Sequence, residues 1–93
     1  MVNFVQNDRA FEIVTDTEQA LVPVWKEVLQ ITQPIAPGTD FFELGGDSMT
    51  MVMLEFRIQE EFGVRLPPGA ILEAPTLSDL AAMIDSEKSS LSQ

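Results

Sequence analysis

The sequence contains no cysteine and no histidine. Because cysteine is absent, disulfide bonds and thiolate metal sites are excluded, and the reducing cytoplasm is the expected compartment. Because histidine is absent, the chain lacks both the commonest general base and the commonest metal ligand. We therefore expect neither a metal centre nor catalysis by the chain itself.

Basic residues are scarce, and long hydrophobic runs are missing. Five Lys and Arg stand against fifteen Asp and Glu, which gives a formal net charge of −10. This field repels nucleic acid and anionic membranes and attracts basic protein surfaces, unless the acidity only keeps the domain dissolved. No apolar run approaches the roughly 18 residues that span a bilayer, and no signal-peptide pattern opens the sequence. We expect neither nucleic acid nor a membrane as a partner.

The residues that are present suffice for one small core. Of 93 residues, 45% are hydrophobic, and neither an internal repeat nor strand-like alternation occurs. We therefore expect an all-α fold, a small four-helix bundle of three longer helices and one short one, with a long ordered loop between the first two. The expected organisation is a leader at 1–14, a domain at 15–86 and a flexible tail at 87–93.

The first helix is expected over residues 15–30, with Thr15 or Thr17 as its N-terminal cap. Pro23 removes one helical hydrogen bond, so that the helix either kinks there or becomes regular only near it. The apolar spacing predicts a core stripe of Leu21, Val24 or Trp25, Val28 and Leu29.

Two further helices and a short one follow. The second is expected over 48–62, ended by Gly63 in a left-handed conformation. A short helix or turn at 69–74 precedes a last helix at 77–87, which Thr76 caps. The expected core residues are Met51, Leu54, Ile58 and Phe62 in the second helix and Leu77, Leu80, Ala81 and Ile84 in the last.

The connection at 30–47 contains prolines and glycines but also several large apolar residues. A loop of this length in a small domain is usually functional or held down by its own side chains. We therefore expect it to be packed through Ile31, Ile35, Phe41, Phe42 and Leu44.

Ser48, in the stretch DFFELGGDSMTMV, is the candidate functional residue. As a nucleophile it would need a base, and the chain has no histidine. The Gly-X-Ser-X-Gly elbow is absent, and Asp47 stands where a phosphate-binding loop would have lysine. A calcium loop built from Asp40, Glu43 and Asp47 lacks the alternating ligands and the final glutamate.

Two interpretations of this junction remain open. In the first, Ser48 or Asp47 is merely the helix cap, and Gly45 and Gly46 form the turn. In the second, the glycine pair allows a sharp bend or a close approach, and the hydroxyl at the helix N-terminus holds a phosphate ester.

Four blocks of the sequence resemble carrier proteins of the acyl or peptidyl type, which serve nonribosomal peptide and polyketide synthesis. They are VWKEVL at 24–29, LGGDS at 44–48, EEFGV at 60–64 and EAPTLSDLA at 73–81. The resemblance covers roughly residues 16 to 86. It implies that a separate transferase attaches 4′-phosphopantetheine from coenzyme A to Ser48, so that the partner enzyme supplies the activation that this chain lacks.

The resemblance also implies a function and a set of partners. The arm would hold an aminoacyl, peptidyl or acyl group as a thioester and present it to successive enzymes, with the chain acting as a monomer. The implied partners are a phosphopantetheinyl transferase, an adenylation or acyl-loading enzyme, and condensation, ketosynthase, tailoring or thioesterase domains.

Two positions depart from the common pattern. Many peptidyl carriers have histidine before the serine, whereas this chain has Asp47, which is common in acyl carriers and occurs in some peptidyl ones. Met49 stands where leucine or isoleucine is usual. Trp25 and the glycine pair favour the peptidyl type. The alternatives are an acyl carrier of a polyketide or fatty-acid-like pathway, an acidic interaction domain, and a carrier-like scaffold without an arm.

A docking patch is predicted on the second helix, opposite its core stripe. At 100° per residue, Met49, Val52, Met53 and Phe56 share this side. Methionine suits a surface that fits several partners in turn. The alternative is that Val52 and Phe56 pack beneath the long loop or against another helix. Acids at the patch would steer basic partners, or are only solvated surface: Asp47, Glu43, Glu55 and Glu60.

Overall fold

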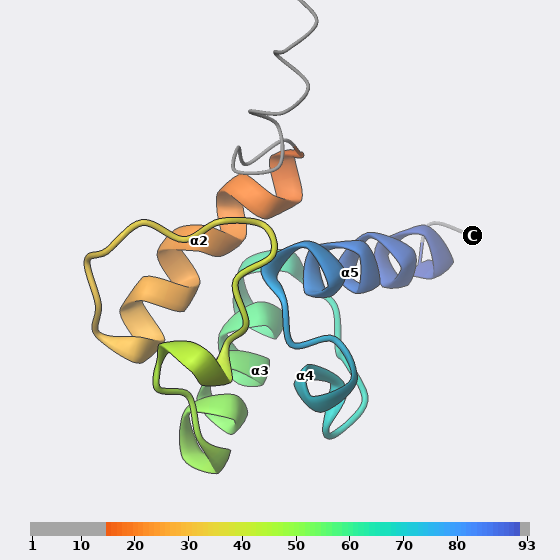
Figure 1. Cartoon of the computed structure of the whole chain (residues 1–93). Coiled ribbons are helices and arrows are strands. Elements are labelled where there is room, and N and C mark those ends of the chain that lie inside the picture. Colours follow the sequence, from red (N-terminus) through yellow and green to blue (C-terminus); the bar gives the residue numbers. More distant parts are fainter. Residues whose placement is uncertain (1–14, 92–93) are drawn as a thin grey trace, which may run out of the picture.

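The computed structural model describes residues 15–91, so that the expected leader at 1–14 and the last two residues lie outside the described part. Within that part the fold is all-helical with no strand, as predicted (Figure 1). The elements are α2 (Asp16–Leu29), the 3₁₀ helix η3 (Phe42–Leu44), α3 (Ser48–Phe62), α4 (Ala70–Glu73) and α5 (Leu77–Leu91).

A reciprocal cap begins α2. The Thr15 hydroxyl accepts from the Glu18 N–H at 3.0 Å, and a Glu18 carboxylate oxygen accepts from the Thr15 N–H at 3.3 Å. Thr15 is therefore the cap, while Thr17 is buried and donates to Asp85 of α5 at 2.5 Å. The helix begins at Asp16 and contains Pro23, so that of the two alternatives the one in which it becomes regular only near Pro23 is wrong.

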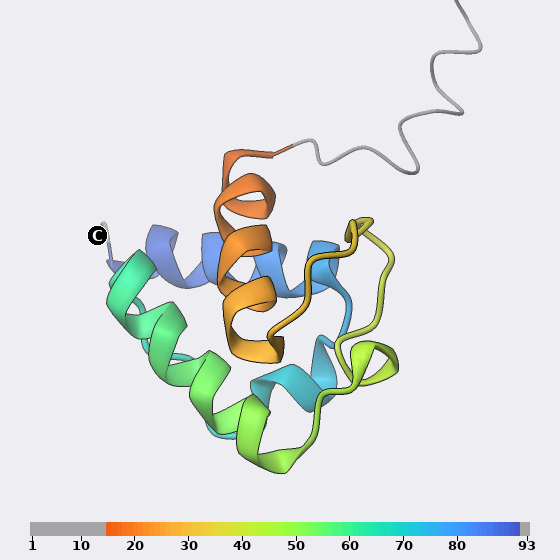
Figure 2. The ribbon, with the colours of Figure 1, turned by 90° about the vertical axis from the view of Figure 1, so that its left-hand side faces the viewer.

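Three long helices surround the core. α2 contacts both α3 and α5 (Figure 2). The predicted core residues are buried except Leu29, Met51 and Phe62, which are half-buried and pack against the rim of the core. Both Val24 and Trp25 are buried. The largest fully buried side chains are Trp25, Phe41, Leu21, Leu54, Ile58, Ile71, Leu77, Leu80, Ile84 and Val64.

The connection between α2 and α3 is fixed to the start of α5. It crosses to that point before it turns back to α3 (Figure 1). The Phe41 N–H donates to the Pro75 carbonyl at 2.8 Å, and the Ser78 N–H donates to the Pro37 carbonyl at 2.8 Å. Ile35 and Phe41 are buried, which supports the expectation of a packed loop.

The 3₁₀ turn η3 was not predicted. The Asp40 side chain nucleates it by accepting from the Phe42 N–H at 2.7 Å and the Glu43 N–H at 3.3 Å. An aspartate that bonds backbone two and three residues further on is the usual device for such a turn. The hydrogen bonds of Asp40 therefore stabilise the turn within the loop.

Thr76 caps α5 as predicted, because its hydroxyl accepts from the Asp79 N–H at 3.1 Å. The end of the helix differs from the prediction, since α5 continues through the expected tail as far as Leu91. Lys88 explains part of this extension. Its ammonium lies 5.8 Å from the centre of the Phe62 ring on α3, and its position in the last turn complements the helix dipole.

Candidate functional site

Ser48 is the first residue of α3, and its side chain is exposed. The start of α3 lies at the outer edge of the molecule (Figures 1 and 2). The chain reaches it through Gly45, which ends η3 at φ 103°, a left-handed conformation that favours glycine. The Gly46 N–H then donates to the Phe41 carbonyl at 3.2 Å, which ties the turn to the buried part of the loop.

Asp47, and not Ser48, caps α3. The Asp47 carboxylate accepts from the Thr50 N–H at 3.0 Å, and the Thr50 hydroxyl accepts from the Asp47 N–H at 2.7 Å. Within residues 15–89, whose side chains are described, the Ser48 hydroxyl has no hydrogen-bond partner. Of the two candidate caps, Asp47 is therefore the actual cap, and the Ser48 hydroxyl is not needed for capping.

Capping also changes the acidity of Asp47. Hydrogen bonds from the backbone and then the side chain of Thr50 stabilise the charged form and lower the pKa of the Asp47 carboxyl below its ordinary value of 3.8. The group is therefore ionised at neutral pH.

We predict that Asp47→Ala lowers the thermal stability of the domain at pH 7 and that the gap to wild type narrows in acid. A carboxyl with a lowered pKa stabilises the fold above its unfolded-state value of about 3.8, and this contribution is lost as the pH falls through the lowered folded-state value. Thermal unfolding of wild type and Asp47→Ala, followed by circular dichroism at several pH values from 7 to 2, measures this difference in stability. Asp47→Asn, which keeps an acceptor but no charge, is the matched control. A gap that stays constant over this range contradicts the prediction.

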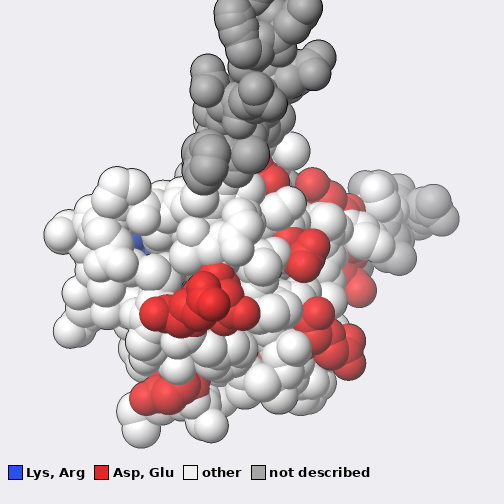
Figure 3. All heavy atoms as spheres, in the orientation of Figure 1, with Lys and Arg blue, Asp and Glu red and all other residues white. Residues whose placement is uncertain are grey.

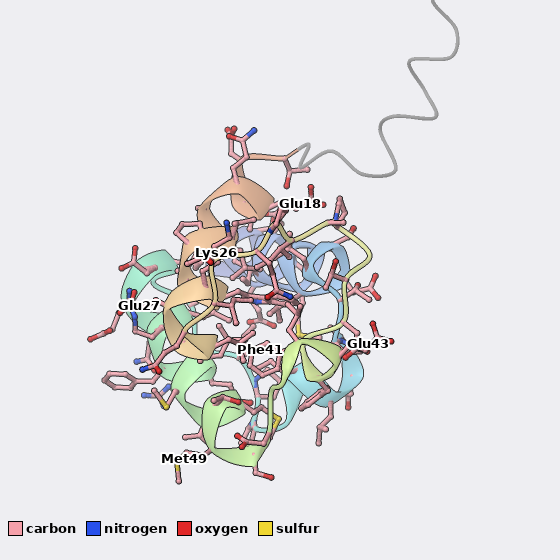
Figure 4. The ribbon with its side chains drawn as sticks, turned by 60° about the vertical axis from the view of Figure 1, so that its left-hand side comes forward. Glu18, Lys26, Glu27, Phe41, Glu43 and Met49 are labelled. Atoms are coloured by element: carbon pink, nitrogen blue, oxygen red, sulfur yellow. The ribbon has the colours of Figure 1, made fainter. Side chains whose placement is uncertain are left out.

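The predicted docking residues form one exposed apolar face, here named the α3 apolar surface. Its members and their exposed fractions are Met49 at 73%, Val52 at 61%, Met53 at 47% and Phe56 at 62%. The alternative that Val52 and Phe56 pack beneath the loop or against another helix is therefore wrong. Met49 lies at the tip and points away from the body of the protein (Figure 4).

Leu72 of α4 is another large exposed apolar side chain, at 64%, and was not predicted from the sequence. α4 is joined to α3 because a Glu55 carboxylate oxygen accepts from the Gly69 N–H at 3.1 Å. The helix has only four residues, so that sequence periodicity could not assign its faces. Glu55, predicted as a steering charge, thus has a structural bond as well.

The other predicted acids differ in their surroundings. Glu60 pairs with Arg57, which also binds Glu27 of α2 at 2.7 Å and Glu61 at 3.1 Å. These bonds raise the pKa of the Arg57 guanidinium above its usual range, and the bond to Glu27 has the largest effect. Glu43 is exposed on η3 (Figure 4). Among residues 15–91 no group of acids is arranged to hold a metal, Asp40, Glu43 and Asp47 included.

Among the charged side chains on the face drawn in Figure 3, nearly all are acidic, and hardly any Lys or Arg is seen. This agrees with the sequence, because residues 27–56 contain no basic residue. No helix within residues 15–91 has both the length and the apolar character that crossing a bilayer requires.

The chain matches the family model described as "phosphopantetheine attachment site" over residues 19–84. It is 36% identical over 76 residues to phosphinothricin tripeptide synthetase PhsC of Streptomyces viridochromogenes, covering 82% of this chain and 7% of the relative. It is 42% identical over 77 residues to the hybrid PKS-NRPS synthetase LUC5 of a Fusarium species, covering 80% and 2%. The chain thus spans only a small part of these synthetases.

Solved structures agree with the family match. A structure described as a nonribosomal PCP domain is 35% identical, with a TM-score of 0.67 and coverage of 77% of this chain and 91% of that one. A chain from the complex of the phosphopantetheine transferase Sfp with coenzyme A and a peptidyl carrier protein is 25% identical, with a TM-score of 0.73 and coverage of 78% and 94%. The predicted cofactor, covalent 4′-phosphopantetheine, is the group that this family carries. The chain therefore belongs to the phosphopantetheine attachment site family.

Proposed function

We propose that Ser48 accepts 4′-phosphopantetheine and that the chain thereby presents aminoacyl or peptidyl groups to the enzymes of a nonribosomal peptide pathway. One observation carries the proposal: the exposed hydroxyl at the start of α3 has no structural task, because Asp47 caps the helix. The family match supports phosphopantetheine as the attached group, and the LGGDS block at 44–48 supports Ser48 as the proposed attachment site.

The surroundings of Ser48 fit a bulky phosphodiester. Neighbouring Asp47 and Met49 are both exposed, and a side-chain atom built at Gly45 would meet nothing within 4 Å. The first N–H groups of a 15-residue helix and its positive dipole end favour a phosphate there. When attached, the group supplies a terminal thiol that can hold cargo as a thioester, which this cysteine-free chain otherwise cannot offer.

The chain itself provides little to activate the hydroxyl. The carboxylate nearest in sequence, Asp47, is committed to Thr50, and its lowered pKa makes it a weak base. Carrier domains are in general not catalytic. We therefore infer that this chain is not an enzyme and that a separate phosphopantetheinyl transferase activates Ser48, as the likeness to the Sfp complex supports.

The α3 apolar surface is proposed as the docking patch, with Asp47 at its edge. Four large apolar side chains are exposed within the first nine residues of the helix that begins at Ser48. A partner must contact this region to reach the hydroxyl. The acidic surface favours partners with a basic rim, because complementary charge speeds encounter.

The proposed partners follow from the chemistry of loading and transfer. They are the transferase, an adenylation enzyme that loads the thiol, and condensation, tailoring and thioesterase domains that use the cargo. Because one relative is a hybrid PKS-NRPS synthetase, a ketosynthase or acyl-loading partner belongs to the same proposal. The domain would act as a monomer in the cytoplasm.

A thiol count tests the proposed function. The sequence has no cysteine, so the untreated protein has no thiol for iodoacetamide to alkylate. After incubation with coenzyme A and a promiscuous phosphopantetheinyl transferase, the intact mass should rise by one phosphopantetheine, and iodoacetamide at neutral pH should then add one alkyl group. Protein incubated without coenzyme A is the control. An unchanged mass with an active transferase would count against the carrier function.

A further inference from the structure

Gly46 is required for a different reason from Gly45. A side-chain atom at Gly46 would lie 2.4 Å from Cε2 and 2.5 Å from Cδ2 of the Phe41 ring, and 2.9 Å from the Phe41 carbonyl oxygen. Gly45 has the left-handed backbone but open space around it, whereas Gly46 has no positive φ and is pressed against the ring. The absent side chain at 46 therefore lets the turn close onto Phe41.

The Phe41 ring is held firmly, so that it cannot easily make room. It is fully buried and meets Trp25 edge to face, with ring centres 5.3 Å apart and planes at 72°. Its second ring contact is Phe42, at 5.5 Å. Its N–H donates to the Pro75 carbonyl at 2.8 Å, which holds the backbone as well. Figure 4 shows Phe41 in the interior, between the long loop and the helices.

A side chain at Gly46 would therefore displace the turn outward, and only Asp47 separates Gly46 from Ser48. The fully buried residues of α3 are Leu54 and Ile58, which lie beyond its first turn. The first turn thus depends on the loop for its position.

We infer that Gly46 is a positioning residue for the modification of Ser48: its contact with the Phe41 ring sets where the turn presents the hydroxyl to the transferase. This rests on the proposed function. Docking and presentation are separable, because Gly46 lies outside the α3 apolar surface.

The test is steady-state kinetics of the transferase with coenzyme A on wild type, Gly46→Ala, Phe41→Leu and the double variant. We expect Gly46→Ala to lower kcat about tenfold to a hundredfold, as displacement of a reacting group by about 1 Å does, with KM little changed. In the Phe41→Leu background the same change should cost less, because the ring atoms that it meets are gone. We expect kcat to recover only in part in the double variant, because the Phe41 carbonyl oxygen still lies 2.9 Å from the added side-chain atom.

Two further measurements separate presentation from stability. Gly38→Ala, at a site with nothing within 4 Å and no positive φ, is the matched control and should keep wild-type kinetics. Trp25 is the single tryptophan and the chain has no tyrosine, so that near-UV circular dichroism at the tryptophan band reports on the ring beside Phe41. This signal should change in Gly46→Ala while far-UV helical content is kept.

The outcomes are distinct. A wild-type kcat in Gly46→Ala, an equal loss in the Phe41→Leu background, or a loss of helical content that accounts for the kinetics would each overturn the inference. If wild type itself accepts no phosphopantetheine, the proposed function fails and the positioning role fails with it. The contact between position 46 and the Phe41 ring is then still tested by the Trp25 signal, which should change less between Phe41→Leu and the double variant than between wild type and Gly46→Ala.

Discussion

Ser48→Ala is expected to abolish the addition of phosphopantetheine completely, with no mass increase even after long incubation with transferase and coenzyme A. The variant removes the oxygen that forms the ester, and the neighbouring hydroxyl, that of Thr50, is bonded to Asp47. Its fold should be unchanged, because the side chain is exposed and Asp47 still caps α3 through Thr50. Intact-mass spectrometry measures the first point and far-UV circular dichroism the second.

Ser78→Ala is the matched control for this result. Ser78 also lies at the start of a long helix, as the second residue of α5, but it is half-buried and its N–H is bonded to the Pro37 carbonyl. This variant should be modified like wild type. A full mass increase in Ser48→Ala, or its loss in Ser78→Ala with the fold intact, would show that the attachment site lies elsewhere.

Replacing Met49 or Met53 by glutamate is expected to lower kcat/KM of the transferase by about tenfold or more, mainly through KM. A charge placed in an apolar contact must be desolvated there without a partner, which costs more than the loss of one apolar contact. Both side chains are exposed, at 73% and 47%, so that the domain itself should keep its stability.

Gln59→Glu is the control for these two variants. It adds the same charge to an exposed position of α3 outside the α3 apolar surface. We expect it to keep a KM close to wild type. If Met49→Glu and Met53→Glu are as competent as Gln59→Glu with the transferase and with a loading enzyme, the docking proposal is wrong.

The long helices could be predicted from sequence because local signals agree there. For α3, apolar spacing, a capping residue at 47 and Gly63 at its end fix the bounds Ser48–Phe62. The end of α5 was misjudged because its last residues are polar, whereas the contact of Lys88 with Phe62 is made across the fold. Similarly, η3 depends on the bonds of one side chain, that of Asp40, and periodicity carries no signal for it.

The residues of the candidate site could be predicted from the sequence, but the role of each residue could not. The sequence indicated a hydroxyl, a cap and two glycines at one junction, yet left open whether Ser48 or Asp47 is the cap. Only the hydrogen bonds of Asp47 with Thr50 decide this. The sequence also does not show that Gly45 and Gly46 are needed for different reasons. The requirement at Gly46 arises from its contact with the Phe41 ring, which is a contact made by the folded chain.

The central claim is that the free hydroxyl of Ser48 carries the arm, and peptide mapping tests it most directly. The protein is treated with transferase and coenzyme A, digested, and fragmented in a mass spectrometer under conditions that keep the phosphodiester. We predict that one peptide carries the added mass and that its fragment ions locate it on Ser48. The added mass on any other residue, or no modified peptide at all in a folded and fully digested sample, would contradict the claim.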